Sequence, residues 1–284
     1  MTLHVNAQFK DDSTTVLNDN KLYVITKNDG TEFVGKIISM NAREYLIDTK
    51  KMGLVYIPKH EIKDVKEVKE GELNATGEYI PSEVFSTRYF ITTNALPIEQ
   101  GESYVQWNLW GPDLQFGVRK NFGIGIMTSW VGIPIVGTAK YSFNLGKKFN
   151  AGIGTLIGTG SWAAPDFGLA LPFGSLTYGD RRYNLNFSFG YGAVLIDGDS
   201  EGKALLSVGG MAKVGKKISL VLDSFIIPNT SGNSNQSNGI AIIVPGTRWQ
   251  TNSNTAFQLG FAGVVYEGQA EPIPIPMLQW YRKL

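Results

Sequence analysis

Histidine, serine and cysteine are the residue types that would mark a hydrolytic site, and this chain places them poorly. Its two histidines are His4 and His60, so residues 61–284 offer no imidazole base for a Ser-His-Asp mechanism. The run from Gly198 to Gly202 (GDSEG) matches the GxSxG pattern, but that pattern requires a strand-to-helix turn and a partner base. Cysteine is absent, which excludes thiolate nucleophiles and thiolate metal sites. The sequence therefore predicts a protein that is not an enzyme.

Two short motifs could bind an ion or a phosphate, and each has a simpler interpretation. Asp197, Asp199 and Glu201 alternate along one stretch, and such carboxylates could hold Ca²⁺, but a solvated acidic loop accounts for the same pattern. The glycine-rich run that begins at Gly152 (GIGTLIGTG) lacks the lysine and the following helix of a phosphate-binding loop. We therefore expect no metal ion and no cofactor.

Four charged residues stand on the small-residue face of segments that otherwise carry few charges: Lys140, Lys213, Asp223 and Arg248. If these segments form a barrel, the four side chains face its lumen, where a buried charge must be paired or hydrated. Two roles are open. The charges could select solutes in a pore, or they could form an internal salt-bridge network that braces a closed barrel.

The segments that carry these charges alternate large apolar residues with small ones. In residues 183–193 (YNLNFSFGYGA), Leu185, Phe187, Phe189 and Tyr191 share one face, and similar alternation recurs in 122–130, 149–157, 218–226 and 255–265. A soluble β-barrel would cover its outer face with charge, but these segments have almost none to offer. Lipid reverses the requirement, so the pattern predicts a transmembrane β-barrel with its large apolar side chains outward.

Polar turns divide this part into hairpins, at 119–122, 146–149, 180–183, 215–218 and 251–254. Five turns on one side join five pairs of strands, and one strand at each end makes about twelve. We expect strands to begin near Glu102, Leu114, Phe122, Val136, Phe149, Phe167, Tyr183, Lys203, Ile218, Gly239, Thr255 and Ile273. An even count places both chain ends on the side of the tight turns, which is periplasmic in an outer-membrane barrel.

Two features leave the strand count open at ten or fourteen. Pro272, Pro274 and Pro276 interrupt the last predicted strand, where each missing N–H would break a ladder bond. Residues 87–98 could add a strand or form a plug.

The density of charged residues divides the chain. Residues 8–85 contain 25 Asp, Glu, Lys and Arg, whereas the much longer stretch 86–284 contains 26. A break of this size beside a turn-rich stretch indicates a domain boundary. We therefore expect a signal-peptide remnant at 1–7, a small soluble β-domain at 8–68, a linker at 69–85 and a barrel at 86–284.

The first domain shows short alternating runs that predict strands at about 21–26, 33–40, 44–48 and 54–58, with a closing segment near 62–65. Their spacing resembles SH3-like or Sm-like small barrels. Lysine and glutamate alternate throughout, so the basic groove of an RNA-binding domain is missing and no nucleic-acid partner is expected. Such a module most often docks other proteins, and a structural spacer is the alternative.

The N-terminal residues Val5-Asn6-Ala7 before Gln8 look like the cleavage site that ends a secretory signal peptide, although a plain disordered N-terminus gives the same pattern. A signal peptide would send the chain to the periplasm and outer membrane of a Gram-negative bacterium, with the first domain periplasmic.

A resemblance to a known group covers most of residues 86–284. The runs STRYFITTNALPIEQGESYVQWNLWGPDLQFGVRKNFGIGIMTSW, NLGKKFNAGIGTLIG and KVGKKISLVLDSFIIPN resemble uncharacterised outer-membrane β-barrel proteins with similar hairpins rich in glycine and aromatic residues. The resemblance implies fold and location only. We expect an anchoring or interaction subunit, embedded in outer-membrane lipid, that meets protein partners through its first domain. A passive channel for small polar solutes is the alternative.

Overall fold

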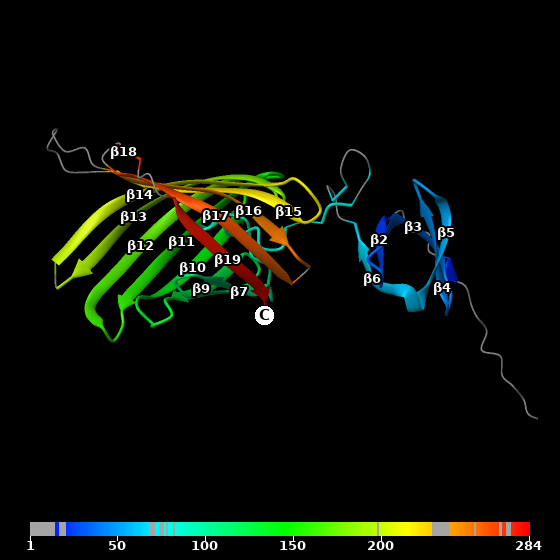
Figure 1. Cartoon of the computed structure of the whole chain (residues 1–284), viewed down its shortest axis with the longest axis horizontal. Coiled ribbons are helices and arrows are strands. Elements are labelled where there is room, and N and C mark those ends of the chain that lie inside the picture. Colours follow the sequence, from blue (N-terminus) through cyan, green and yellow to red (C-terminus); the bar gives the residue numbers. More distant parts are fainter. Residues whose placement is uncertain are drawn as a thin grey trace, which may run out of the picture. The chain divides into compact units, whose positions relative to one another are not determined.

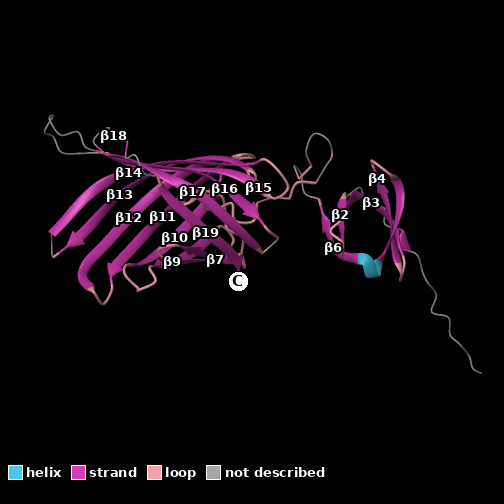
Figure 2. Cartoon of the chain, in the orientation of Figure 1, coloured by secondary structure: helices cyan, strands magenta, loops and turns pink. Residues whose placement is uncertain are grey.

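The computed structural model describes residues 15–16, 21–68, 72–73, 77, 79–81, 83–197, 199–228, 239–252, 254–266, 269–270 and 274–284. These residues divide into two units, Met1–Pro81 and Ser82–Leu284. The expected signal-peptide remnant at 1–7 lies outside the described residues. Strands dominate both units, as Figure 2 shows. Within the described residues, no helix has the length and apolar character needed to span a membrane.

The first unit is a six-stranded antiparallel sheet with the order β5-β4-β3-β2-β6, and β1 pairs with β3. Its core is a cluster of four isoleucines: Ile25, Ile37, Ile47 and Ile57. The five predicted strand positions all coincide with described strands. The elements are β1 (Thr15–Val16), β2 (Tyr23–Lys27), β3 (Glu32–Met40), β4 (Glu44–Thr49), β5 (Gly53–Pro58), the 3-10 helix η1 (Lys59–Glu61) and β6 (Ile62–Glu67).

The second unit is a closed antiparallel barrel, in which twelve strands of the described residues form a ring. Pairing of β19 with β7, from Gln279 opposite Asn108 to Lys283 opposite Tyr104, closes it. A two-residue strand, β18 (Gln269–Ala270), pairs only with β17. The ring consists of β7 (Ser103–Asn108), β8 (Pro112–Arg119), β9 (Phe122–Thr128), β10 (Ile135–Asn144), β11 (Phe149–Gly160), β12 (Ala164–Gly179), β13 (Tyr183–Ile196), β14 (Asp199–Lys213), β15 (Ile218–Ile227), β16 (Ile240–Gln250), β17 (Thr255–Tyr266) and β19 (Ile275–Lys283).

The predicted count of twelve is confirmed, and each strand begins within four residues of its predicted start. All five tight turns lie at one end of the ring, together with the start of β7 and the end of β19, which Figure 1 marks as C. We call this end the turn end and the opposite end the loop end. Strand β19 tolerates Pro276 because β7 pairs only with its last residues, so the strand is an unpaired edge there. Pro272 lies outside the described residues.

The outer face of the barrel is apolar, as the alternation predicted. On β13, Leu185, Phe187, Phe189 and Tyr191 are each 50% to 60% exposed, whereas the alternate residues such as Asn186 are buried. Aromatic rings gather at both ends of this band. They pair at the turn end in Tyr141–Phe143, Phe149–Tyr178, Trp249–Phe257 and Phe257–Trp280. At the loop end Trp107 stacks on Trp130, with ring centroids 5.8 Å apart. An apolar band between two aromatic girdles is typical of transmembrane barrels.

The predicted linker at 69–85 is wrong in part, because residues at both of its ends belong to folded units. Leu73 pairs with Tyr79 in the first unit. Glu83 and Phe85 are fully buried in the second unit, where Phe85 packs between Tyr104 and Tyr281. The charge density that suggested the linker reports exposure on average, and it cannot reveal which individual side chains a distant part of the chain buries.

Residues 86–96 form a narrow hairpin inside the barrel, which we call the inserted hairpin. Arg88 and Thr93 form an isolated antiparallel bridge, and the Asn94 N–H donates to the Thr87 carbonyl. Wall side chains from many strands around the ring bind this hairpin. Of the two alternatives predicted for residues 87–98, the plug is therefore the correct one.

Candidate functional site

Asp223, on β15, binds the tip of the inserted hairpin. Its carboxylate accepts hydrogen bonds from the backbone N–H groups of Ile91, at 2.6 Å, and Thr92, at 2.9 Å. The Thr92 hydroxyl donates a third, at 2.6 Å. Asp223 is only 1% exposed, so these three donors replace the water that a carboxylate needs.

Arg248, on β16, holds the leg of the hairpin that enters the barrel. Its guanidinium donates to the carbonyls of Phe85 and of Arg88, the latter at 2.8 Å, and to the side-chain amide oxygen of Gln258. The guanidinium carbon lies 4.6 Å from the ring centroid of Tyr281, within cation–π range. Arg248 is fully buried, and its planar set of donors spans acceptors on two different segments.

Lys140, on β10, holds the returning leg. Its ammonium donates to the Thr93 hydroxyl at 3.2 Å and to the carbonyls of Asn94 and Leu96 at 2.7 and 3.2 Å. All three acceptors are uncharged. No carboxylate among the described residues lies within ion-pair distance of Lys140, so its positive charge is solvated by oxygen dipoles alone.

Lys213 stands at the turn-end limit of β14, where the chain enters the barrel. Its ammonium lies 3.3 Å from the Glu83 carboxylate and 3.0 Å from the Gln250 amide oxygen. The same carboxylate oxygen accepts a hydrogen bond from Ser219 at 2.8 Å. Lys213 and Glu83 are both fully buried, so each compensates the charge of the other. The four residues predicted as lumen charges thus all bind the inserted hairpin or the residues just before it.

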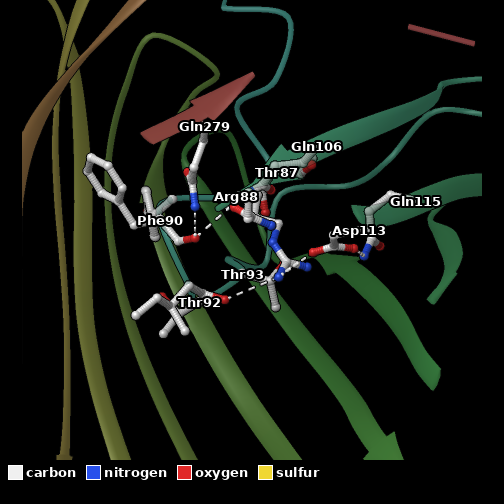
Figure 3. A network of polar contacts seen from close by, with 12 residues as sticks. Thr87, Arg88, Phe90, Thr92, Thr93, Gln106, Asp113, Gln115 and Gln279 are labelled. Atoms are coloured by element: carbon white, nitrogen blue, oxygen red, sulfur yellow. Dashed lines mark hydrogen bonds and ion pairs between the residues drawn. The ribbon is translucent and has the colours of Figure 1, made fainter. Parts of the chain in front are cut away.

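Sequence reasoning missed the partners that the hairpin itself brings. The Arg88 guanidinium lies 2.6 Å from the carboxylate of Asp113 on β8, as Figure 3 shows. In the same view the Gln279 amide donates to the Phe90 carbonyl at 2.7 Å. The inward position of Gln279 on its strand was the one available signal, because an amide facing a lumen needs polar partners. Nothing in the sequence pairs Arg88 with Asp113.

A second ion pair that sequence reasoning missed lies at the turn end, outside the strands, and binds the chain just after the inserted hairpin. Arg181 donates twice to the Glu102 carboxylate, at 2.8 Å each, and once to the Pro97 carbonyl at 2.8 Å. Burial raises the pKa of Glu102, but the hydrogen bonds and the charge of Arg181 outweigh it, so the pKa lies below its ordinary value. The pair therefore stays ionised at neutral pH and fixes the returning leg beside β7.

Glycines on the inward face make room for the two aromatic rings of the hairpin tip. A Cβ added to Gly209 would lie 2.5 Å from the Tyr89 ring, and one added to Gly246 would collide with the Phe90 ring. Tyr89 also donates to the side chain of Asn184 at 2.6 Å. The small-residue face is therefore shaped to the hairpin at these positions.

None of the other predicted motifs gathers into a reactive site in the described residues. Asp199 and Ser200 begin β14 and pair with Ile196 and Leu195, so this part of the GxSxG run is extended strand rather than a strand-to-helix turn, and Gly198 lies outside the described residues. No group of three His, Cys, Asp or Glu side chains in the described chain is placed to hold a metal ion. The arrangement observed inside the barrel is one of closure: buried charges and amides bind backbone.

No family model and no curated protein matches this sequence. Among solved structures, the chain is similar to the NanC porin in a rhombohedral crystal form, with 9% identity, a TM-score of 0.46, and coverage of 64% of this chain and 98% of that one. It is also similar to a loop L8 deletion mutant of OmpT, an outer membrane protein of Vibrio cholerae. There the identity is 9%, the TM-score is 0.42, and the coverage is 93% of this chain and 96% of that one.

Proposed function

We propose that this protein is an outer-membrane β-barrel, closed by its own hairpin, that anchors its first domain in the periplasm as a docking module for other proteins. One observation carries the proposal: Lys140, Asp223 and Arg248 direct their hydrogen bonds to the inserted hairpin. Charges that select solutes must face water along an open path. Charges committed to a plug favour an anchor over a passive channel.

The outer face supports a membrane location. Large apolar side chains are exposed around the whole ring, and a contiguous patch of that size would drive association in water. Hydrocarbon accepts such a face, and closure of the sheet pairs most of the backbone groups that lipid could not solvate. The turn end is assigned to the periplasm because the periplasmic turns of such barrels are short. A cleaved signal peptide ahead of Gln8 is part of the same proposal.

The first unit supports the docking role. Strands β2 to β5 follow one another as a meander, and after η1 the chain returns as β6 to pair with β2, an arrangement that fits an SH3-like small barrel. Its edge strand β5 exposes Leu54 and Tyr56, each 63% accessible, on one face. An edge strand with apolar side chains is suited to receive an extended segment of a partner. A purely structural spacer would not explain why Leu54 and Tyr56 are exposed on this edge strand.

Planar-bilayer recording tests the closure. The folded full-length protein, identified by different gel mobility before and after boiling, is expected to give no steady conductance. A passive channel is the second candidate function, and the two cavities beside the hairpin described below favour it. A constant conductance of the wild-type protein would support that candidate and overturn the anchor.

Site-specific photocrosslinking in cells tests the docking role. A photoreactive residue at position 54, on the exposed face of β5, is expected to give one defined adduct with a periplasmic or outer-membrane protein. The matched control is position 63, which is exposed on the other edge strand, β6. Adducts of equal yield at both positions, or none at position 54, would contradict a docking surface on β5.

A further inference from the structure

The inward-facing side chains change from polar to apolar along the longest strands. On β12, Thr177 and Ser175 near the turn end are followed by Phe173 and Leu171 toward the loop end. On β14, Lys213 at the turn end gives way to Leu205. The inserted hairpin occupies the polar part. Among the described residues no backbone segment fills the apolar part, so its character calls for another occupant.

A cavity of about 260 Å³ lies at this transition, between the inserted hairpin and the wall. Its apolar lining includes Met127, Leu156, Leu171, Phe173, Leu205 and Phe225. An apolar protein cavity of roughly 150 Å³ stays dry and binds benzene. The larger cavity here has room for a longer apolar group, and its lining would be a poor site for water.

One side of the cavity is polar and holds donors without partners. The Ser207 hydroxyl lines the cavity, and its side chain is 2% exposed with no hydrogen-bond partner among the described residues. The Nε of Arg88 is likewise buried without a partner. A buried donor left unpaired destabilises the protein until an acceptor satisfies it. Lys140 lines the same cavity and meets only uncharged oxygens, which adds positive potential.

A second cavity, of about 410 Å³, extends the apolar space toward the loop end. It shares Arg88, Ile91 and Met127 with the first, so the two meet at the hairpin tip. Its lining includes the apolar residues Ile242, Val264 and Met277 on β16, β17 and β19, and also Asn108 and Asp113 on β7 and β8. The Asp113 carboxylate in this lining is paired with Arg88, so its charge is compensated.

We propose that the lumen binds a single-chain carboxylic acid of the fatty-acid class. The carboxylate lies against Ser207, Arg88 and Lys140, and the chain lies along Leu156, Phe173 and Leu205. Charge complementarity selects an acid over a neutral lipid, because Lys140 has no carboxylate within ion-pair distance in the described part of the chain. Arg88 is already paired with Asp113 and offers only its free Nε–H, beside the free hydroxyl of Ser207. The size of the cavity selects one chain over two. This role goes beyond the proposed anchor and is compatible with a closed lumen.

The first test measures binding of dodecanoate, labelled with ¹³C at its carboxyl, to the full-length protein in nanodiscs. The wild-type protein is expected to give a saturable shift of the carboxyl resonance. Leu205→Trp fills the cavity with an indole ring and takes the space of the ligand chain, so binding should weaken about tenfold. Val208→Trp is the matched control, because it adds the same ring on the lipid-facing side of β14. Binding by L205W equal to that of V208W, or no saturable binding by the wild-type protein, would overturn the proposal.

The second test addresses the head group. Ser207→Ala removes a hydroxyl without a partner among the described residues, so it leaves the packing of the chain intact. It is expected to weaken dodecanoate binding about fivefold and dodecanol binding by about twofold or less, since a hydrogen bond to a charged group contributes more than one to a neutral group. If the wild-type protein binds dodecanol as tightly as dodecanoate, the proposed recognition of a carboxylate is wrong. Gel mobility before and after boiling verifies that each variant is folded.

Discussion

The two halves of the barrel lumen share the same strands but carry different chemistry. Toward the turn end the inward face is polar and is filled by the inserted hairpin, which wall residues such as Asn186 and Thr177 contact. Toward the loop end the inward face of the longest strands is apolar and lines the first cavity, whereas β8 carries the buried Asp113 there. The polarity of the turn-end half therefore follows the hairpin that fills it rather than the solvent.

The reason lies in the backbone of the hairpin. A narrow hairpin surrounded by a barrel leaves carbonyl and N–H groups that no neighbouring strand can pair, and each must find another partner. The carbonyls of Arg88, Phe90 and Asn94 find side-chain donors, and the N–H of Ile91 finds a carboxylate. Charged and amide residues on the wall therefore mark where the chain itself passes.

Deleting the hairpin should abolish the difference between the halves. When residues 86–96 are replaced by a short Gly-Ser link, the ring of twelve strands keeps its ladder while Lys140, Asp223 and Arg248 become hydrated. The variant should form a steady ion-conducting pore where the wild-type protein forms none, because a barrel of this size is wide enough to hold water once the plug is gone. A variant that is folded by gel mobility and still fails to conduct would show that something other than the hairpin closes the lumen.

The ring could be predicted from sequence, whereas the plug could not be resolved. Alternation and tight turns are local signals, so they located the twelve strands and the outward face, including Phe187 and Phe189 on β13. Parity placed Arg248 on the inward face for the same reason. Its partner, the Arg88 carbonyl, is 160 positions away in a segment without periodicity. No local pattern encodes such a contact, so the sequence left open whether these charges select solutes or brace a closed barrel.

Removing the Asp223 carboxylate should loosen the tip of the hairpin. Asp223→Ala leaves the N–H groups of Ile91 and Thr92 buried without acceptors, which costs on the order of 3 kcal/mol. Their amide hydrogens should then exchange about a hundredfold faster, which hydrogen–deuterium exchange of the folded protein measures. Asp223→Asn keeps one acceptor oxygen, so its exchange rates at Ile91 and Thr92 should lie between those of the wild-type protein and those of Asp223→Ala. Equal exchange in all three proteins would mean that the tip is held by other contacts.

A side chain at Gly209 would occupy the space of the Tyr89 ring and should destabilise the polar half selectively. A methyl group at Gly209 meets the Tyr89 ring at 2.5 Å, whereas one at Gly174, on the outer face, meets its nearest atom at 4.0 Å. Gly209→Ala should therefore destabilise the folded barrel by roughly 1–3 kcal/mol, and Gly174→Ala should change it little. The temperature at which the compact gel band disappears reports the difference. If both variants lose the compact gel band at the same temperature, the aromatic ring of Tyr89 can move aside without destabilising the barrel.

The smallest effect is expected at the turn-end mouth, where Glu102 pairs with Arg181. The pKa of Glu102 is lowered in the folded protein, so the pair contributes stability above the unfolded pKa of a glutamate, roughly 4.3, and loses it as the pH falls through the lower folded pKa. Glu102→Gln should thus lower the free energy of unfolding by about 1 kcal/mol at pH 7, in the range of partly exposed ion pairs. Urea titrations at pH 7 and at pH 3 measure this, and the difference from the wild-type protein should shrink at the lower pH. A difference that stays constant between the two pH values would mean that the glutamine destabilises the mouth through its shape rather than through the lost charge, and that packing rather than the ion pair holds this end of the barrel.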